Sequence, residues 1–284
     1  MICFTKKILW MFLITYYSIF NILLNLIIDK KTLYLSFCYF NYLMSKLFNV
    51  NLYIKNDYKS KKTIILHNHV SIYDIFISFI CQAYYNNVYE FCLKKQVSYI
   101  PGIGWWCRIM NFPILSRSKL DIETLKNHKT NNSVLIYPEG TRLNKKKYKE
   151  AAIFAKKNNI KHSKYTLIPK STGSFNLVQM KDIEYVTVSL IIYFDNNGKI
   201  LNNFKKILFP KKVMIYNKNY PINQIPKKDT EFKKWLHNEF YKVNDIKNID
   251  LPENKIQVKP RFSQKILVLI TLIYPIILFY LILF

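Results

Sequence analysis

The chain has 284 residues, enough for one substantial globular domain together with membrane segments. Its 43 lysine and arginine residues outnumber 17 acidic residues, and the formal net charge of +26 indicates a polyanionic partner: nucleic acid, an anionic membrane surface or a phosphorylated substrate. Half of the residues are hydrophobic, with the apolar content concentrated at the two ends, and there is no arginine-rich arm, zinc-finger spacing or RNA-binding signature. These features argue against nucleic acid and favour a membrane surface.

Two long apolar runs lie near the ends of the chain. Residues 8–28 carry no charge, and a helix of this length can cross a bilayer core of about 30 Å. Residues 266–284 are also uncharged and are close to the minimum spanning length. Residues 32–54 are apolar and aromatic but interrupted by polar side chains, which predicts a helix lying against the membrane interface. We therefore expect a membrane helix and an interfacial helix within 1–54, and a basic linker with a second membrane helix within 251–284.

The middle of the chain, residues 55–250, alternates between strand-like and helix-like segments. The predicted strands are 63–66, 133–137, 166–169 and 185–194, and the predicted helices are 72–85, 119–129, 147–158 and 229–245. This alternation is typical of an α/β domain with a mostly parallel sheet flanked by helices. Ligand sites in such sheets lie at the carboxyl ends of the strands. We therefore expect the segments that follow the first three predicted strands to meet at one edge.

The segment from His67 to Asp74 joins the first predicted strand to the first predicted helix. Ser71 stands three residues before Asp74, a spacing typical of a helix start. Across such a turn, Asp74 can hold one imidazole nitrogen of His69 and leave the other free to act as a base. Three interpretations are open: a capping box beside a satisfied histidine, a metal site of His67, His69 and Asp74, and a catalytic His–Asp pair. The five cysteines are scattered without a Cys-x-x-Cys pair, so they predict neither a disulfide framework nor a zinc site.

Three later segments each contain turn-forming residues followed by a positively charged side chain. Residues 99–117 run through glycines and aromatic side chains to Arg117, which suits a wall beside a lipid substrate or an aromatic patch packed on membrane-facing helices. The strand at 133–137 is followed by Glu139, Gly140, Thr141 and Arg142, where a guanidinium can match phosphate oxygens or simply pair with the glutamate. The strand at 166–169 ends in Pro169 and Lys170.

Taken together, these four segments resemble the glycerolipid acyltransferases of the 1-acylglycerol-3-phosphate O-acyltransferase family. That family carries four blocks in order: Asn-His-x4-Asp, a glycine-rich stretch ending in a phosphate-contacting arginine, Glu-Gly-Thr-Arg, and Pro-Arg/Lys-x-x-Gly. The corresponding residues here are Asn68-His69 with Asp74, Gly102 to Arg117, Glu139 to Arg142, and Pro169-Lys170 with Gly173. The resemblance covers about residues 55–245 and extends to the family's longer eukaryotic branch, which includes lysocardiolipin-type acyltransferases. Two departures, Val70 in place of a basic residue and Lys170 in place of arginine, affect the headgroup preference and not the reaction.

The resemblance implies transfer of an acyl chain from acyl-CoA to the free hydroxyl of lysophosphatidic acid, which gives phosphatidic acid. In this reaction His69 would accept the hydroxyl proton, and Asp74 would hold the imidazole tautomer and stabilise the imidazolium. Arg117 and Arg142 would hold the substrate phosphate, while Glu139 would orient Arg142 or a glycerol hydroxyl. The substrate-binding residues would be Arg117, Glu139, Gly140, Thr141, Arg142, Pro169 and Lys170.

The resemblance also sets expectations about partners and location. It implies a lysophospholipid and acyl-CoA as co-substrates, contact with an anionic membrane surface, and neither a metal nor a redox cofactor. It implies no nucleic-acid partner and no obligate protein partner. The protein would be an integral membrane protein, most simply of the endoplasmic reticulum, with its catalytic domain facing the cytosol. The alternatives are an acyltransferase for lysocardiolipin or lysophosphatidylinositol and, more distantly, a catalytically silent membrane lipid-binding protein.

Overall fold

The computed structural model describes residues 2–58, 62–116, 118, 120–180, 182–195, 197–198, 200–201, 211–244 and 255–283, with the side chains from 12 to 273 apart from Leu120. The strands are β1 (Asn51–Lys55), β2 (Thr63–His67), β3 (Tyr89–Phe91), β4 (Leu93–Lys94), β5 (Ile114–Leu115), β6 (Ser133–Ile136), β7 (Tyr185–Phe194) and β8 (Lys212–Pro221). The α-helices are α1 (Ile2–Leu24), α2 (Lys30–Leu47), α3 (Asp74–Tyr85), α4 (Ile103–Ile109), α5 (Leu120–Asn127), α6 (Lys145–Lys157), α7 (Ser171–Val178), α8 (Asp229–Tyr241) and α9 (Phe262–Leu283). Two 3₁₀ helices, η1 (Lys95–Tyr99) and η2 (Ile222–Gln224), complete the described elements.

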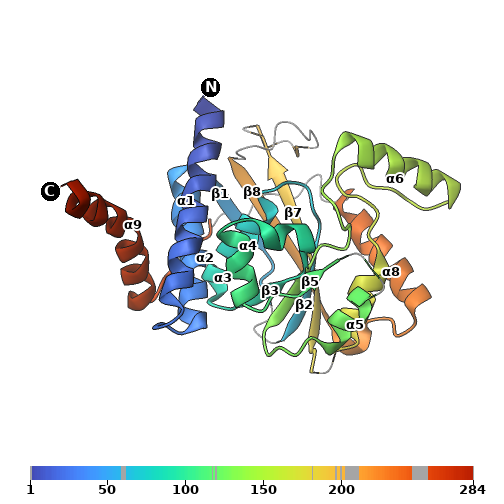
Figure 1. Ribbon diagram of the computed structural model, residues 1–284. Coiled ribbons are helices and arrows are strands. Elements are labelled where there is room, and N and C mark those ends of the chain that lie inside the picture. Colours follow the sequence, from blue (N-terminus) through green and yellow to red (C-terminus); the bar gives the residue numbers. More distant parts are fainter. Residues whose placement is uncertain are drawn as a thin grey trace.

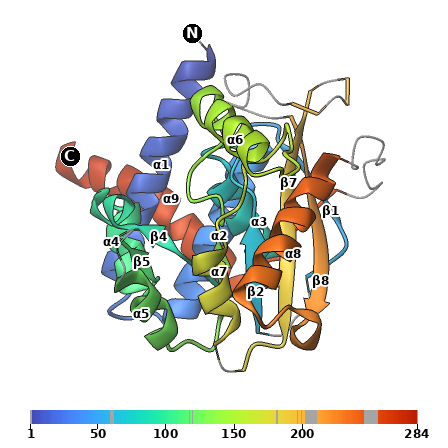
Figure 2. The same ribbon diagram turned by 90° about the vertical axis from the view of Figure 1, so that its right-hand side faces the viewer.

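The main sheet of the described residues has the strand order β1-β8-β7-β2-β6-β3. All of its neighbouring strands run parallel except β7 and β8, which pair antiparallel over their full length. Figures 1 and 2 show α2 and α3 against one face of the sheet and α7 and α8 against the other. The predicted α/β class, a mostly parallel sheet flanked by helices, is confirmed.

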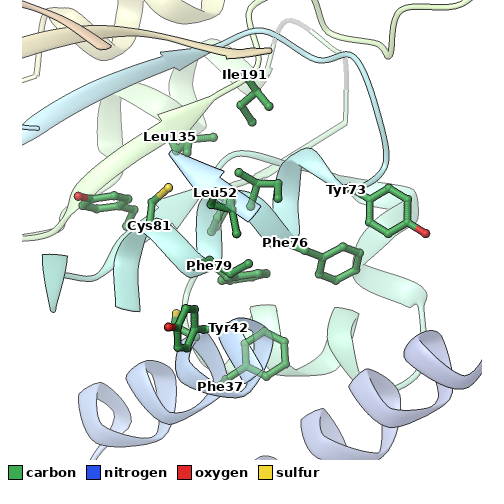
Figure 3. Close-up of a cluster of buried hydrophobic side chains, with 14 of the residues drawn as sticks. Phe37, Tyr42, Leu52, Tyr73, Phe76, Phe79, Cys81, Leu135 and Ile191 are labelled. Atoms are coloured by element: carbon green, nitrogen blue, oxygen red, sulfur yellow. The ribbon is translucent and has the colours of Figure 1, made fainter. Parts of the chain in front are cut away.

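The central strands are apolar on both faces because each face carries its own hydrophobic core. In β2, Ile65 belongs to the core that α2 and α3 cover, whereas Ile64 and Leu66 belong to the core that α7 and α8 cover. Figure 3 shows part of the first core, where Phe37 from α2 and Phe79 from α3 lie beneath the sheet. Burial on both faces explains why the strands β2, β6 and β7 appear in the sequence as continuous apolar runs.

The predicted strands at 63–66, 133–137 and 185–194 are confirmed as β2, β6 and β7. The strand predicted at 166–169 is wrong. Residues 166–169 form no strand, although Leu167 is buried. Pairing in a sheet requires a neighbouring strand, and this segment is held instead by the amide of Lys170, which donates to the carbonyl oxygen of Pro138 at 2.9 Å. The segment nevertheless comes to the edge where it was expected, beside the end of β6.

The four predicted helices of the central domain correspond to α3, α5, α6 and α8, with ends that differ by a few residues. The helix predicted over 32–54 is shorter, because α2 ends at Leu47 and residues 51–55 form β1. Asn49 has a φ of +60°, a left-handed conformation that ends the helix, and the amide of Val50 closes the turn onto the carbonyl oxygen of Ser45 at 2.8 Å.

The helices at the two ends of the chain are in contact through one hydrogen bond. The Tyr16 hydroxyl of α1 donates to the carbonyl oxygen of Thr271 in α9 at 3.1 Å, and α9 also packs on α2 (Figure 1). In the part of the chain whose side chains are described, no helix combines the length and the apolar character needed to span a membrane. The predicted spans at 8–28 and 266–284 extend into side chains outside that part. The division into 1–54, 55–250 and 251–284 stays a prediction. The strand β1 (Asn51–Lys55), which pairs with β8 in the main sheet, begins before the predicted boundary at residue 55.

Candidate active site

The site lies at the carboxyl edge of the sheet, where the chain leaves β2. The β2–β7 ladder ends at the pair His67–Ser189, and Asn68 continues it with its side chain. The Asn68 amide group donates to the carbonyl oxygen of Ile191 at 3.0 Å, and its oxygen accepts from the amide of Ile191 at 2.7 Å. This reciprocal pair fixes the start of the loop that carries His69.

His69 and Asp74 form the hydrogen bond expected of a catalytic pair, with 2.9 Å between Nδ1 and Oδ2. The Asp74 side chain is fully buried, whereas that of His69 is 20% exposed. The same Oδ2 accepts from the amides of Val70 at 2.7 Å and Ser71 at 2.8 Å, and the hydroxyl of Tyr193 donates to Oδ1. A carboxylate only accepts hydrogen bonds, so Nδ1 carries the proton and Nε2 is left free to act as a base.

These contacts fit the His–Asp interpretation and only half of the capping box. The N-cap of α3 is Tyr73, which makes no side-chain capping bond, so Ser71 is not the cap. Asp74, the first residue of α3, accepts from the amides of Val70 and Ser71 ahead of the helix and orients His69 with the same oxygen. The metal interpretation has no support, because no group of three His, Cys, Asp or Glu side chains in the described part of the chain is arranged to hold an ion. His67 is a core residue instead: its Nε2 lies 3.3 Å from the hydroxyl of Tyr58, and burial lowers its pKa to about 3.

The segment after β6 wraps around His69. The ring of Tyr137 stacks on the imidazole at 4.4 Å between centroids and 28° between planes. Beyond it, the amide of Gly140 donates to the carbonyl oxygen of Tyr137 at 2.9 Å, and Gly140 has a φ of +65°, which an L side chain rarely adopts. The amide of Leu143 then donates to the carbonyl oxygen of His69 at 2.7 Å. The predicted juxtaposition of these two strand ends is present.

Glu139 points inward from this turn. Its Oε1 accepts from the amide of His69 at 3.3 Å, and its buried Oε2 has no hydrogen-bond partner among the described residues. Burial raises the pKa of Glu139 well above its ordinary value, and the amides of His69 and Leu167 oppose this effect only in part. Arg142 is exposed, and in the described part of the chain its guanidinium forms no ion pair with Glu139. The carboxyl group therefore supports the loop that carries His69 and does not pair with Arg142.

A cavity of about 580 Å³ adjoins this turn and brings together most of the predicted binding residues. Its wall includes Glu139, Gly140, Thr141, Pro169 and Lys170. Nε2 of His237, in α8, lies 3.1 Å from the carbonyl oxygen of Pro169 and so donates to it, which fixes this part of the wall. His69, Asp74 and Arg142 do not line the cavity, and Arg117 lies outside the described residues.

Several contributors to the site were not predicted. Tyr193 reaches Asp74 from a strand that is 119 residues away along the chain, and only the alternation of side chains along that strand places it on the same face as Ile191. The opposite wall of the cavity comes from α6 and α8, with Lys147, Lys233 and His237. No local sequence signal marks these three residues as neighbours of the turn at Glu139 and Gly140.

Comparison with known proteins gives consistent results. Residues 49–191 match the family model described as Acyltransferase. The chain is 24% identical over 211 residues to mouse lysocardiolipin acyltransferase 1, covering 69% of this chain and 56% of that protein. It is 27% identical over 157 residues to lysophosphatidylinositol acyltransferase 10 of Caenorhabditis elegans, covering 51% of this chain and 40% of the relative. The chain thus spans about half the length of the curated relatives it matches.

A solved structure has the same fold. The 1-acyl-sn-glycerophosphate (LPA) acyltransferase PlsC from Thermotoga maritima superposes with a TM-score of 0.55 at 18% sequence identity. The superposition covers 87% of this chain and all of the other. At this identity the likeness concerns the fold alone.

Proposed function

Because the chain belongs to the acyltransferase family, we propose that it transfers an acyl chain from acyl-CoA to the free hydroxyl of a lysophospholipid, with lysophosphatidic acid as the acceptor. The observation that carries this proposal is the His69–Asp74 pair, in which the free Nε2 lies on the partly exposed side chain and the carboxylate is buried. An intact pair of this kind argues against a catalytically silent lipid binder. Lysocardiolipin or lysophosphatidylinositol is the alternative acceptor, because two of the similar proteins carry those names.

In the proposed reaction, the acceptor hydroxyl oxygen attacks the thioester carbonyl carbon while Nε2 of His69 takes the hydroxyl proton. The new ester C–O bond forms, the C–S bond breaks, and the imidazolium returns the proton to the departing CoA thiolate. Asp74 stabilises the imidazolium without taking its proton. No covalent acyl-enzyme is needed, and burial raises the pKa of the Cys107 thiol, which makes that residue a poor nucleophile.

The proposal assigns the acceptor phosphate to Arg142 and Arg117, and it includes acyl-CoA as co-substrate with no metal or redox cofactor. We also propose that this chain is an integral membrane protein of the endoplasmic reticulum and that its catalytic domain faces the cytosol. The supporting observations are the apolar runs at 8–28 and 266–284 and the formal charge of +26. No nucleic-acid or obligate protein partner is part of the proposal.

The activity is tested by offering the purified protein a panel of lysophospholipids with labelled oleoyl-CoA. Lysophosphatidic acid should be acylated fastest, and the His69→Ala variant, purified in the same way, controls for contaminating enzymes. Faster acylation of lysocardiolipin or lysophosphatidylinositol would select the alternative acceptor. Absence of product with every acceptor would refute the proposed activity.

Membrane insertion is tested separately by washing isolated membranes with high salt and then with alkaline buffer. Burial of apolar segments does not depend on ionic strength, so an inserted protein should stay with the membranes, whereas binding through charge alone is reversed by salt. Release of the intact protein by salt would show that neither terminal run inserts.

A further inference from the structure

The cavity beside Glu139 has a wall that the family motifs do not account for, contributed by α6 and α8. We infer that this cavity is a phosphoryl-binding site in which lysines of α6 and α8 act together with Lys170. The inference rests on the proposed function for the identity of the ligand, since both substrates of that reaction carry phosphate. The phosphoryl group can belong to the lysophospholipid headgroup or to CoA, and the two sources are separated by the experiment below.

The cations of the cavity come from three separate parts of the fold. Lys147 lies in the first turn of α6, Lys170 immediately precedes α7, and Lys233 lies on α8; all three line the cavity. These three elements are far apart in the sequence, so the meeting of their lysines at one cavity does not follow from local sequence. A phosphate group, which carries up to two negative charges, is the ligand that such a convergence suits.

The start of α6 is an independent indication. Its first turn contains Lys145, Lys146 and Lys147 and no acidic residue, the reverse of what the helix dipole favours. A cation at an exposed helix N-terminus destabilises the helix through its interaction with the dipole. An anion bound beside this turn removes that penalty.

The acidic groups of the cavity do not oppose an anion. Glu150 pairs with Lys147, with 2.6 Å between Nζ and Oε2, and both side chains are nearly half exposed, so water screens their charges. Glu139 forms the inner wall, and burial raises the pKa of its carboxyl group well above the ordinary value, which favours the uncharged form. Three lysines against two glutamates line the cavity, so its charge balance is positive even when both carboxylates are counted.

The position of Glu139 also relates the cavity to the chemistry. One oxygen of its carboxyl group accepts from the amide of His69, so a ligand against this wall is separated from the loop of the base by a single side chain. The apolar part of the wall, with Leu167, Ile168 and Phe154, can contact the glycerol or nucleoside portion that carries the phosphate.

The experiment measures binding without turnover, in the His69→Ala background. Glycerol 3-phosphate represents the acceptor headgroup, adenosine 3′,5′-bisphosphate represents CoA, and the affinity of each is measured by calorimetry. The test variant combines Lys170→Gln with Lys233→Gln. The matched control combines Lys149→Gln with Lys234→Gln, which removes the same charge from exposed neighbours on α6 and α8 that do not line the cavity.

The test variant should lose at least about tenfold in affinity for one of the two probes, as expected for the loss of charge-assisted contacts, while the control changes by less than about twofold. The probe that is affected identifies the source of the phosphate. Equal losses of affinity in both variants would show that the probes respond to the overall positive charge of the protein and not to this cavity, and would overturn the inference. Unchanged affinity in the test variant would also overturn it. Phosphate binding in this cavity by a protein that acylates no acceptor would leave the site standing while the proposed function fails.

Discussion

The substitution Asp74→Asn separates the charge of the His–Asp pair from its geometry. Oδ2 accepts from the amides of Val70 and Ser71, so an asparagine must place its oxygen there and turn its NH₂ group towards the hydroxyl of Tyr193. The asparagine oxygen still accepts from Nδ1 of His69, which preserves the tautomer. The variant therefore loses the negative charge and keeps the arrangement of the site.

The expected magnitude follows from the distance. At 2.9 Å between Nδ1 and Oδ2, two unit charges attract by about 6 kcal/mol when the effective dielectric constant is about 20. Both charges are delocalised over two atoms and the imidazole is partly exposed, so we take half of this value, about 3 kcal/mol. Since each 1.36 kcal/mol corresponds to about a tenfold change in rate, kcat should fall roughly a hundredfold.

The assay compares kcat of the two proteins at saturating acyl-CoA and lysophosphatidic acid. Both Michaelis constants and the thermal unfolding midpoint should stay close to those of the unmodified protein, because the three hydrogen bonds to Oδ2 are kept and only the bond with Tyr193 reverses its direction. A kcat within about threefold of the unmodified value would refute the reasoning, since the imidazolium would then not depend on the charge of Asp74.

The remaining predictions concern neighbouring residues. The substitution His69→Ala removes the proton acceptor and should lower kcat by about two to four orders of magnitude without changing the unfolding midpoint; near-normal activity would remove His69 from the mechanism. Arg142→Lys keeps the charge but loses the planar fork, so the Michaelis constant for lysophosphatidic acid should rise while that for acyl-CoA stays; the opposite pattern would assign this arginine to CoA. Tyr193→Phe removes one donor from Asp74 and makes its carboxylate a stronger acceptor, so the acid limb of the pH–kcat profile should move to higher pH, which a purely structural defect would not do. The pKa of His67 is lowered to about 3, so below about pH 6.5 the unfolded chain binds this proton more readily, and the free energy of unfolding should fall by up to about 1.4 kcal/mol per pH unit down to about pH 3. Urea unfolding of His67→Gln should show a shallower pH dependence over that window.

Strands can be predicted from this sequence where every residue of the strand is buried, because the whole segment is then apolar. The strands β2, β6 and β7 are buried on both faces, and their apolar runs show it. The strand β8 was missed because its second half carries Asn217 and Asn219, which look like loop residues. Their side chains hydrogen-bond to Ser189 and Thr187 of β7, partners that only the assembled sheet supplies.

The same distinction holds at the site. The His69–Asp74 pair was predictable because both residues lie on one tight turn, and the predicted neighbourhood of the Glu139 turn follows from parallel strands ending together. The Glu139–Arg142 contact suggested by their proximity is absent because the buried carboxyl turns to the amide of His69. Tyr193 could not be assigned without knowing that β7 lies beside β2.

The contacts between the catalytic loop and β7 also bear on the order of folding. The bonds from Asn68 to Ile191 and from Asp74 to Tyr193 close loops of 123 and 119 residues, which are slow to form and cost chain entropy. A nascent chain that has emerged only as far as α7 already contains all four sequence blocks and the contacts of His69 with Glu139 and Leu143, yet it lacks the partners of Asn68 and of Oδ1 of Asp74 on β7. If the proposed function is correct, we expect activity to appear late in refolding, when β7 docks beside β2, so that its appearance would report the formation of that strand pair.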